Sequence, residues 1–110
     1  MINDTVTRIE GQIRDAGAIP PGQKDELLKL LGTLRQEVSE LSKTNREGAR
    51  SIANFTELSA LEATRTEQNP KLRDLSLEGL KSSAEGFEES HPKLVQAVNS
   101  ISHTLSNLGI

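Results

Sequence analysis

Apolar residues recur along nearly the whole chain in alternating steps of three and four, the spacing that lines up side chains on one face of an α-helix. The first such segment predicts a short helix over about 4–16, capped by Asn3 or Asp4. The prolines at 20–21 then end this segment, because each removes a backbone donor. The apolar face of the segment consists of Ile2, Val6, Ile9, Ile13 and Ala16.

A second segment keeps the same spacing from residue 27 to residue 55 without an internal proline. This pattern predicts one long helix over about 21–66 with Pro21 in its first turn. Asn45 and Gly48 have low helix propensity, so a helix broken near Asn45 is the alternative. The face consists of Leu27, Leu31, Leu34, Val38, Leu41, Asn45, Gly48, Ile52 and Phe55.

A third segment is expected to begin as a helix over 70–89, with Asn69 as its cap. The apolar pattern stays in phase beyond Pro92. The helix therefore either continues to about 108 with a kink at Pro92, or is followed by a nearly collinear helix capped by Ser90 or His91, and Gly109-Ile110 ends it. The face consists of Leu77, Leu80, Ala84, Phe87, His91, Leu94, Val98, Ile101, Leu105 and Leu108.

Two long helices joined by a short turn are expected to fold back on each other. The predicted fold is one all-α domain over 1–110, without β-strands: a long antiparallel, coiled-coil-like hairpin with arms of roughly 60–70 Å, and a short N-terminal helix. One register places Asn45 opposite His91 as a polar layer and Gly48 opposite Phe87 as a size-complementary pair. It also pairs Ile52 with Ala84, Phe55 with Leu80, Leu41 with Leu94, Val38 with Val98, Leu34 with Ile101 and Leu31 with Leu105.

Composition suggests that one copy of such a hairpin cannot bury all of its apolar residues. Hydrophobic residues make up 34% of the chain, with two Phe and no Trp or Tyr, which favours an elongated molecule or an oligomer. Further apolar residues widen the stripe beyond a simple seam, so the first helix and a second copy of the chain are expected to cover them. These residues are Leu28, Leu30, Ala49, Ala53, Leu58, Leu61, Leu72, Leu75 and Val95.

Charge and cysteine content argue against several classes of function. The formal net charge is −3, and 13 basic residues are dispersed among 16 acidic ones, so no concentrated positive field predicts binding to nucleic acid. Cysteine is absent, which excludes thiol catalysis and disulfides. An acidic start without a long apolar run predicts a cytoplasmic protein that does not enter membranes. No strained nucleophile turn or glycine-rich phosphate loop is recognisable, so neither an enzyme nor a cofactor is expected.

His91 is the most unusual residue of the apolar pattern. The favoured interpretation makes Asn45 and His91 a register or capping device, because a single polar residue in a helical seam can fix pairing and oligomeric state. A pH switch is the alternative, since histidine titrates near neutral pH. Glu88 and His91 also form half of a di-iron motif, but Ser100 stands where His103 would need a glutamate, so no metal site is predicted.

Lys43, Arg46 and Arg50 follow one another at helical spacing and offer a positive stripe to an acidic partner. Glu40 and Glu47 dilute this stripe. The proposed register brings three glutamates of the other arm close to it, so cross-arm ion pairs are the favoured use of the three cations. The glutamates are Glu85, Glu88 and Glu89.

Several segments resemble a bacterial family of short, all-helical proteins known only as a domain of unknown function. The similarity is clearest in Ser76-Leu77-Glu78-Gly79-Leu80, in the run from Phe87 to Val95 and in Leu108-Gly109-Ile110, and it extends to Ile9-Glu10 and Ile19-Pro20-Pro21. The resemblance implies a small bacterial helical protein and supplies no reaction, ligand or catalytic residue.

The expected function is therefore a non-enzymatic interaction or assembly module. Self-association is favoured, with a homodimer as the simplest oligomer. The alternative is a regulatory adaptor whose hairpin groove binds a helix of another protein.

Overall fold

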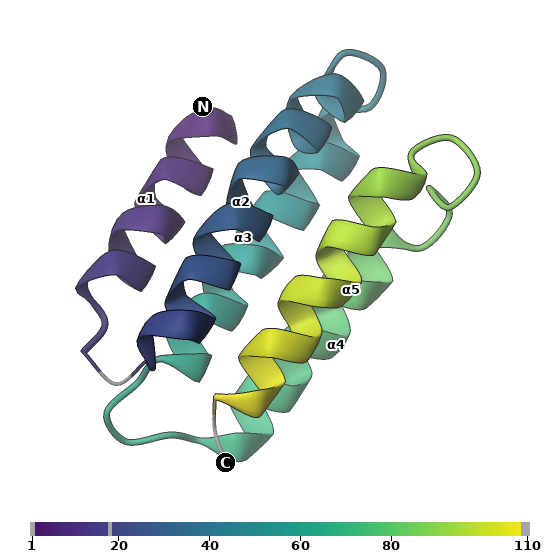
Figure 1. Cartoon of the computed structure of the whole chain (residues 1–110). Helices are drawn as coiled ribbons and strands as arrows, with labels where there is room; N and C mark the ends of the chain where they lie inside the picture. The colour runs from purple at the N-terminus through teal and green to yellow at the C-terminus, as the bar shows by residue number, and fades with distance from the viewer. Residues whose placement is uncertain (1, 18, 109–110) are drawn as a thin grey trace.

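A computed structural model describes residues 2–17 and 19–108 of the chain, and Figure 1 shows the arrangement. Over these residues the protein is all-α, with five helices and no strand. The side chain of Ile2 and the predicted stop at Gly109-Ile110 lie outside the described residues. The helices are α1 (Ile2–Asp15), α2 (Pro21–Ser42), α3 (Arg46–Ala63), α4 (Pro70–Ala84) and α5 (Pro92–Asn107).

The single helix predicted over 21–66 is wrong, because the chain turns back at residues 43–45 and α2 packs against α3. The backbone N–H of Asn45 donates to Leu41 O over 2.7 Å, which closes α2. The Asn45 side-chain oxygen accepts from Gly48 N at 2.8 Å and caps α3. Asparagine has a low helix propensity but is a good N-cap, so the break considered at Asn45 is the conformation that forms.

The predicted continuation of the third segment through Pro92 is also wrong. Residues 85–91 separate α4 from α5, and the two helices lie side by side instead of end to end (Figure 1). Gly86 has φ 96°, a conformation that side chains other than glycine rarely adopt. Its N–H donates to Glu88 Oε2 over 2.7 Å. The turn therefore depends on Gly86, which the apolar pattern does not mark.

These two reversals fold the expected hairpin in half. α2 packs on α5 and α3 packs on α4, as the predicted register requires, but α2 also packs on α3 and α4 on α5. The molecule measures 38 × 24 × 21 Å, so the predicted arms of roughly 60–70 Å do not exist. In Figure 1, α1, α2 and α5 form the front layer and α3 and α4 the back layer, with both reversals at the upper end.

Doubling back covers part of the wide apolar stripe, because each arm now buries side chains against its own second half as well as against the other arm. α3 contacts all four other helices and contributes mainly small buried residues, which allow the helices to approach closely. The largest buried side chains are Val6, Ile9, Ile13, Leu27, Leu31, Leu34, Leu41, Ile52, Leu80, Leu94, Ile101 and Leu105.

Helix α1 packs along α2 and α3. It begins at Ile2, so the prediction that Asn3 or Asp4 caps it is wrong, because both residues lie inside the helix. Arg35 of α2 forms an ion pair with Glu10, and Arg8 Nε lies 3.0 Å from Glu57 Oε2 of α3. The Glu57 carboxylate raises the pKa of Arg8 by hydrogen bonding to its guanidinium and by charge attraction. No helix in the described part of the chain is long and apolar enough to cross a membrane.

Candidate functional site

The sequence predicts that Asn45 and His91 form a buried polar layer, and this prediction is wrong. Both stand immediately before a helix at the same end of the bundle, Asn45 exposed before α3 and His91 partly exposed before α5. Asn45 caps through its side chain, whereas the His91 side chain makes no capping hydrogen bond. The His91 ring instead lies 3.0 Å from Ser90 Oγ and edge-on to Phe87, with the ring centroids 6.2 Å apart. The two residues therefore begin helices and do not fill a seam.

Gly48 and Phe87 lie together in the structure. A Cβ atom added to Gly48 would be 3.0 Å from Phe87 Cζ and 3.0 Å from the Asn45 side chain. Glycine at position 48 thus leaves room both for the capping side chain and for the aromatic ring of the opposite turn. A larger residue would have to move one of them.

Glu88 and His91 are turned to different partners. Glu88 accepts from Gly86 N, while the nearest polar neighbour of the His91 ring is Ser90. Among the described residues no group of three or more His, Asp or Glu side chains is arranged to hold a metal ion. Glu88 and His91 therefore do not form a shared site.

The outer surface of α3 and α4 carries a patch of hydrophobic side chains, here called the α3–α4 face. In the described part of the chain, every large hydrophobic residue that is exposed belongs to it. The Phe55 ring lies across Gly79 of α4, where an added Cβ would come within 2.6 Å of Phe55 Cδ1. The exposed fractions are Phe55 36%, Leu58 42%, Leu61 42%, Leu72 44% and Leu75 53%.

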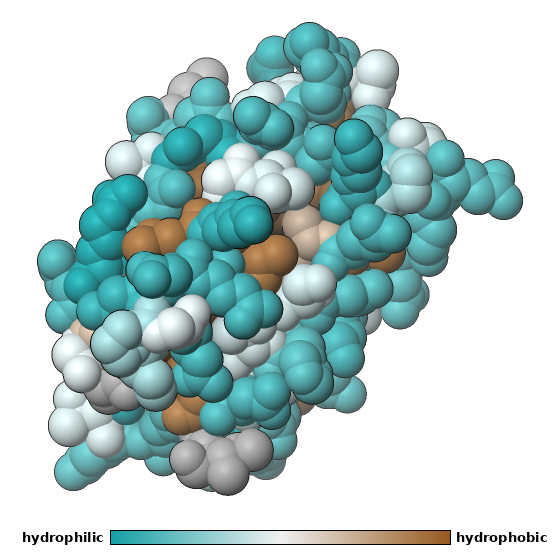
Figure 2. All heavy atoms as spheres, in the orientation of Figure 1, coloured by the Kyte–Doolittle hydropathy of each residue, from teal (hydrophilic) through white to brown (hydrophobic). Residues whose placement is uncertain are grey.

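Phe55 does not occupy the seam position predicted for it opposite Leu80, since its ring covers the neighbouring Gly79 at the surface. Of the residues expected to need cover, Ala49 and Ala53 are buried, and Leu28 and Leu30 are partly buried against the core. The apolar pattern identified the candidates but not which of them stay exposed. The other face, formed by α1, α2 and α5, is mostly hydrophilic with small, separate hydrophobic spots (Figure 2).

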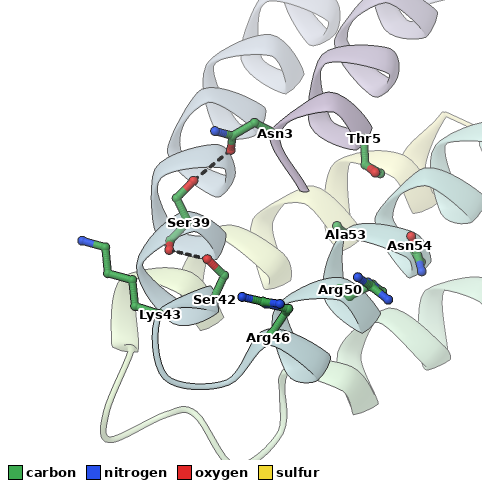
Figure 3. Close-up of a pocket in the computed structure, with 9 residues that line it drawn as sticks. All are labelled: Asn3, Thr5, Ser39, Ser42, Lys43, Arg46, Arg50, Ala53 and Asn54. Carbon is green, nitrogen blue, oxygen red and sulfur yellow. Dashed lines mark hydrogen bonds between the residues drawn. The ribbon is translucent and has the colours of Figure 1, made fainter. Parts of the chain in front are cut away.

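A second feature is a hollow of about 650 Å³ at the upper end of the bundle, between the first turns of α1, the last turns of α2 and the start of α3 (Figure 3). Arg46 and Arg50 line it from α3, and Ser39 and Ser42 line it from α2. Asn3 reaches it from α1, where its side-chain oxygen accepts from Ser39 Oγ at 2.8 Å. The sequence pattern gave no sign that Asn3 and Ser39 would meet these arginines.

The cross-arm ion pairs predicted for Lys43, Arg46 and Arg50 are not formed. Lys43 Nζ lies 3.2 Å from Glu40 Oε1 and extends away from the two arginines (Figure 3). Arg46 and Arg50 make no hydrogen bond or ion pair with any residue that the structure describes. They line the side of α3 that faces α1 and α2, whereas the three glutamates lie in the turn between α4 and α5.

Residues 25–110 match a family model, DUF4404, which is a domain of unknown function, and the chain belongs to this family. The matched region includes most of α2 and the whole of α3, α4 and α5, but not α1. No curated protein and no solved structure matches the chain.

Proposed function

We propose that this protein is a non-enzymatic assembly module that forms a homodimer through the α3–α4 face. The observation that supports this most strongly is the location of the exposed large hydrophobic residues, all of which lie on these two adjacent helices. Scattered single hydrophobic residues are normal on a protein surface, but a contiguous group on one face is typical of an interaction site. Nothing in the core requires these side chains, because α3 and α4 already bury another face.

The size of the face is compatible with a stable dimer. A helix of 18 residues, such as α3, is about 27 Å long, and two helices side by side span roughly 20 Å. Stable protein interfaces bury about 800 Å² on each partner, which is of the same order as the accessible surface of such a rectangle. The five hydrophobic side chains lie between the middle of this rectangle and the turn that joins α3 to α4, and the charged residues around them would form the rim of the interface.

A second copy of the chain is the occupant that the five hydrophobic side chains favour. A two-fold axis through them would place the hydrophobic side chains of one copy against those of the other. Such an arrangement is self-complementary, as a symmetric dimer requires.

The alternative, an adaptor that binds the helix of another protein, would use the same hydrophobic centre. It differs in one measurable property, because an adaptor remains a monomer when it is pure. Mass as a function of concentration therefore separates the two functions.

The proposal is tested by light scattering coupled to size exclusion over a range of protein concentrations. We expect the wild-type chain to be a dimer that dissociates on dilution. Leu58→Glu combined with Leu75→Glu would bury two unpaired carboxylates in the interface, so this variant should be a monomer at every concentration at which the wild type is a dimer. Its circular dichroism should remain helical because both side chains are exposed in the monomer.

The matched control is Gln36→Glu with Gln96→Glu, which adds the same charge to exposed positions of α2 and α5. This control should form the dimer as the wild type does. A wild-type monomer at high concentration would refute self-association, and a dimer that survives the two substitutions on α3 and α4 would place the interface elsewhere.

A further inference from the structure

The hollow described above is separate from the α3–α4 face, and its volume of about 650 Å³ lies within the usual range for small-molecule sites. Three of the side chains that line it are cationic, namely Lys43, Arg46 and Arg50, and no lining side chain described in the structure is acidic. The charge of the hollow therefore differs in sign from the net charge of the chain, which is −3.

Arg46 and Arg50 carry most of the argument. Residues four apart on a helix are neighbours, with Cβ atoms about 6 Å from each other, so the two guanidinium groups repel each other when both are charged. Both side chains are exposed to solvent. Here Glu40 is paired with Lys43 and Glu57 with Arg8, and neither arginine has a partner within the described chain. An anion between them would relieve the repulsion.

The remaining lining groups suit an oxyanion. The Ser39 and Ser42 hydroxyls lie on α2 opposite the arginines, and Asn54 lies beside Arg50 on α3 (Figure 3). Ser42 donates to Ser39 O over 2.7 Å and Ser39 donates to Asn3 Oδ1, but hydroxyl groups rotate at little cost and can donate to a ligand instead. Guanidinium groups bind phosphate oxygens in pairs, which makes arginine the usual residue for this purpose.

The helix ends around the hollow contribute in opposite directions. α1 and α3 begin there and present the positive ends of their dipoles, whereas α2 ends there and presents the negative end of its own. Glu47 and Asp4 are exposed nearby and do not line the hollow. The attraction for an anion thus comes mainly from the two arginine side chains.

We infer that this hollow binds the phosphate group of a small soluble anion, with Arg46 and Arg50 as its principal ligands. The recognised chemistry is a phosphate dianion, free or as a monoester. The inference does not depend on the dimer, because no residue of the hollow belongs to the hydrophobic centre of the α3–α4 face.

The test is a titration of the full chain with inorganic phosphate at constant ionic strength, followed by amide NMR shifts and by the thermal midpoint. We expect saturable shifts centred on Ser39, Ser42, Arg46 and Arg50, and a rise in the thermal midpoint, since a ligand of the folded state stabilises it. Arg46→Gln with Arg50→Gln should weaken binding at least about tenfold, because charge-assisted hydrogen bonds to phosphate are lost.

A matched variant, Lys29→Gln with Lys93→Gln, removes the same charge from exposed positions outside the hollow and should bind phosphate as the wild type does. Binding to phosphatidylcholine vesicles with and without phosphatidic acid is compared with binding to glycerol 3-phosphate. This comparison distinguishes a lipid headgroup from a soluble phosphate monoester as the ligand. We expect glycerol 3-phosphate to bind and the vesicles not to retain the protein.

Two results would overturn the inference. One is the absence of saturable shifts in the wild-type chain. The other is equal phosphate affinity in the wild type and in the variant without the two arginines, with circular dichroism showing that both are folded. Retention on phosphatidic acid vesicles without binding of glycerol 3-phosphate would contradict the soluble source.

Discussion

The pair α2 and α5 and the pair α3 and α4 bury similar apolar seams but differ on their outer surfaces. On α2 and α5 the additional apolar residues Leu28, Leu30 and Val95 are partly covered, and no exposed position carries a large hydrophobic side chain. On α3 and α4 the additional leucines remain exposed, Leu75 by 53%. The difference shows that helical spacing identifies an apolar side chain but does not indicate whether the group that covers it belongs to the same molecule. On α3 and α4 the neighbour is proposed to be a second copy.

The largest expected effect separates core from surface. Leu34→Ala on α2 removes a fully buried side chain and should lower the free energy of unfolding by about 2–5 kcal/mol, because it leaves a cavity. Leu75→Ala on α4 should change the stability of the monomer by less than about 0.5 kcal/mol. Urea denaturation at a concentration low enough to give the monomer measures both. Equal losses at the two positions would show that Leu75 belongs to the monomer core.

Glycine substitutions make the same comparison more finely. Gly32 of α2 has open space where a Cβ would lie, so Gly32→Ala should stabilise the protein by about 0.5–1 kcal/mol. At Gly79 of α4 the new atom would overlap the Phe55 ring, and Gly79→Ala should lose about 1 kcal/mol. Thermal unfolding of the two variants tests this. A gain at Gly79 equal to that at Gly32 would mean that the ring does not rest on α4.

The smallest effect concerns how the second helix of each arm begins. Asn45→Ala removes the hydrogen bond to Gly48 N and should cost about 1 kcal/mol. His91→Ala should cost less than about 0.5 kcal/mol, because its side chain makes no capping bond. Chemical denaturation measures the free energy of unfolding of both variants. A larger loss at His91 would show that the imidazole stabilises the turn in another way.

Much of the core could be predicted from the sequence, because residues three and four apart share a helix face wherever the helix lies. Leu31, Val38 and Ile101, for example, are buried as the pattern indicates. The reversal at Asn45 could not be predicted in this way. Asn45 is compatible with a weakened helix or with a cap, and the choice depends on whether folding back buries more apolar surface than a straight helix does.

The candidate sites show the same limit. The sequence shows that Arg46 and Arg50 are cations at helical spacing. Their position beside α1 and α2 results from the reversal of the chain at residues 43–45. Leu58 and Leu75 were recognised as needing cover, yet their exposure follows from the arrangement of five helices. Local periodicity predicts faces, and only the tertiary fold decides which faces meet.

A single cysteine placed on the α3–α4 face tests the central claim most directly, because the chain has no cysteine of its own. Leu75→Cys lies at the proposed interface, and Gln96→Cys on α5 is its matched control. Under mild oxidation at equal concentration, we expect a disulfide-linked dimer to form rapidly from Leu75→Cys and only slowly from Gln96→Cys. Equal rates for the two variants, or faster linkage through Gln96→Cys, would contradict a dimer formed through α3 and α4.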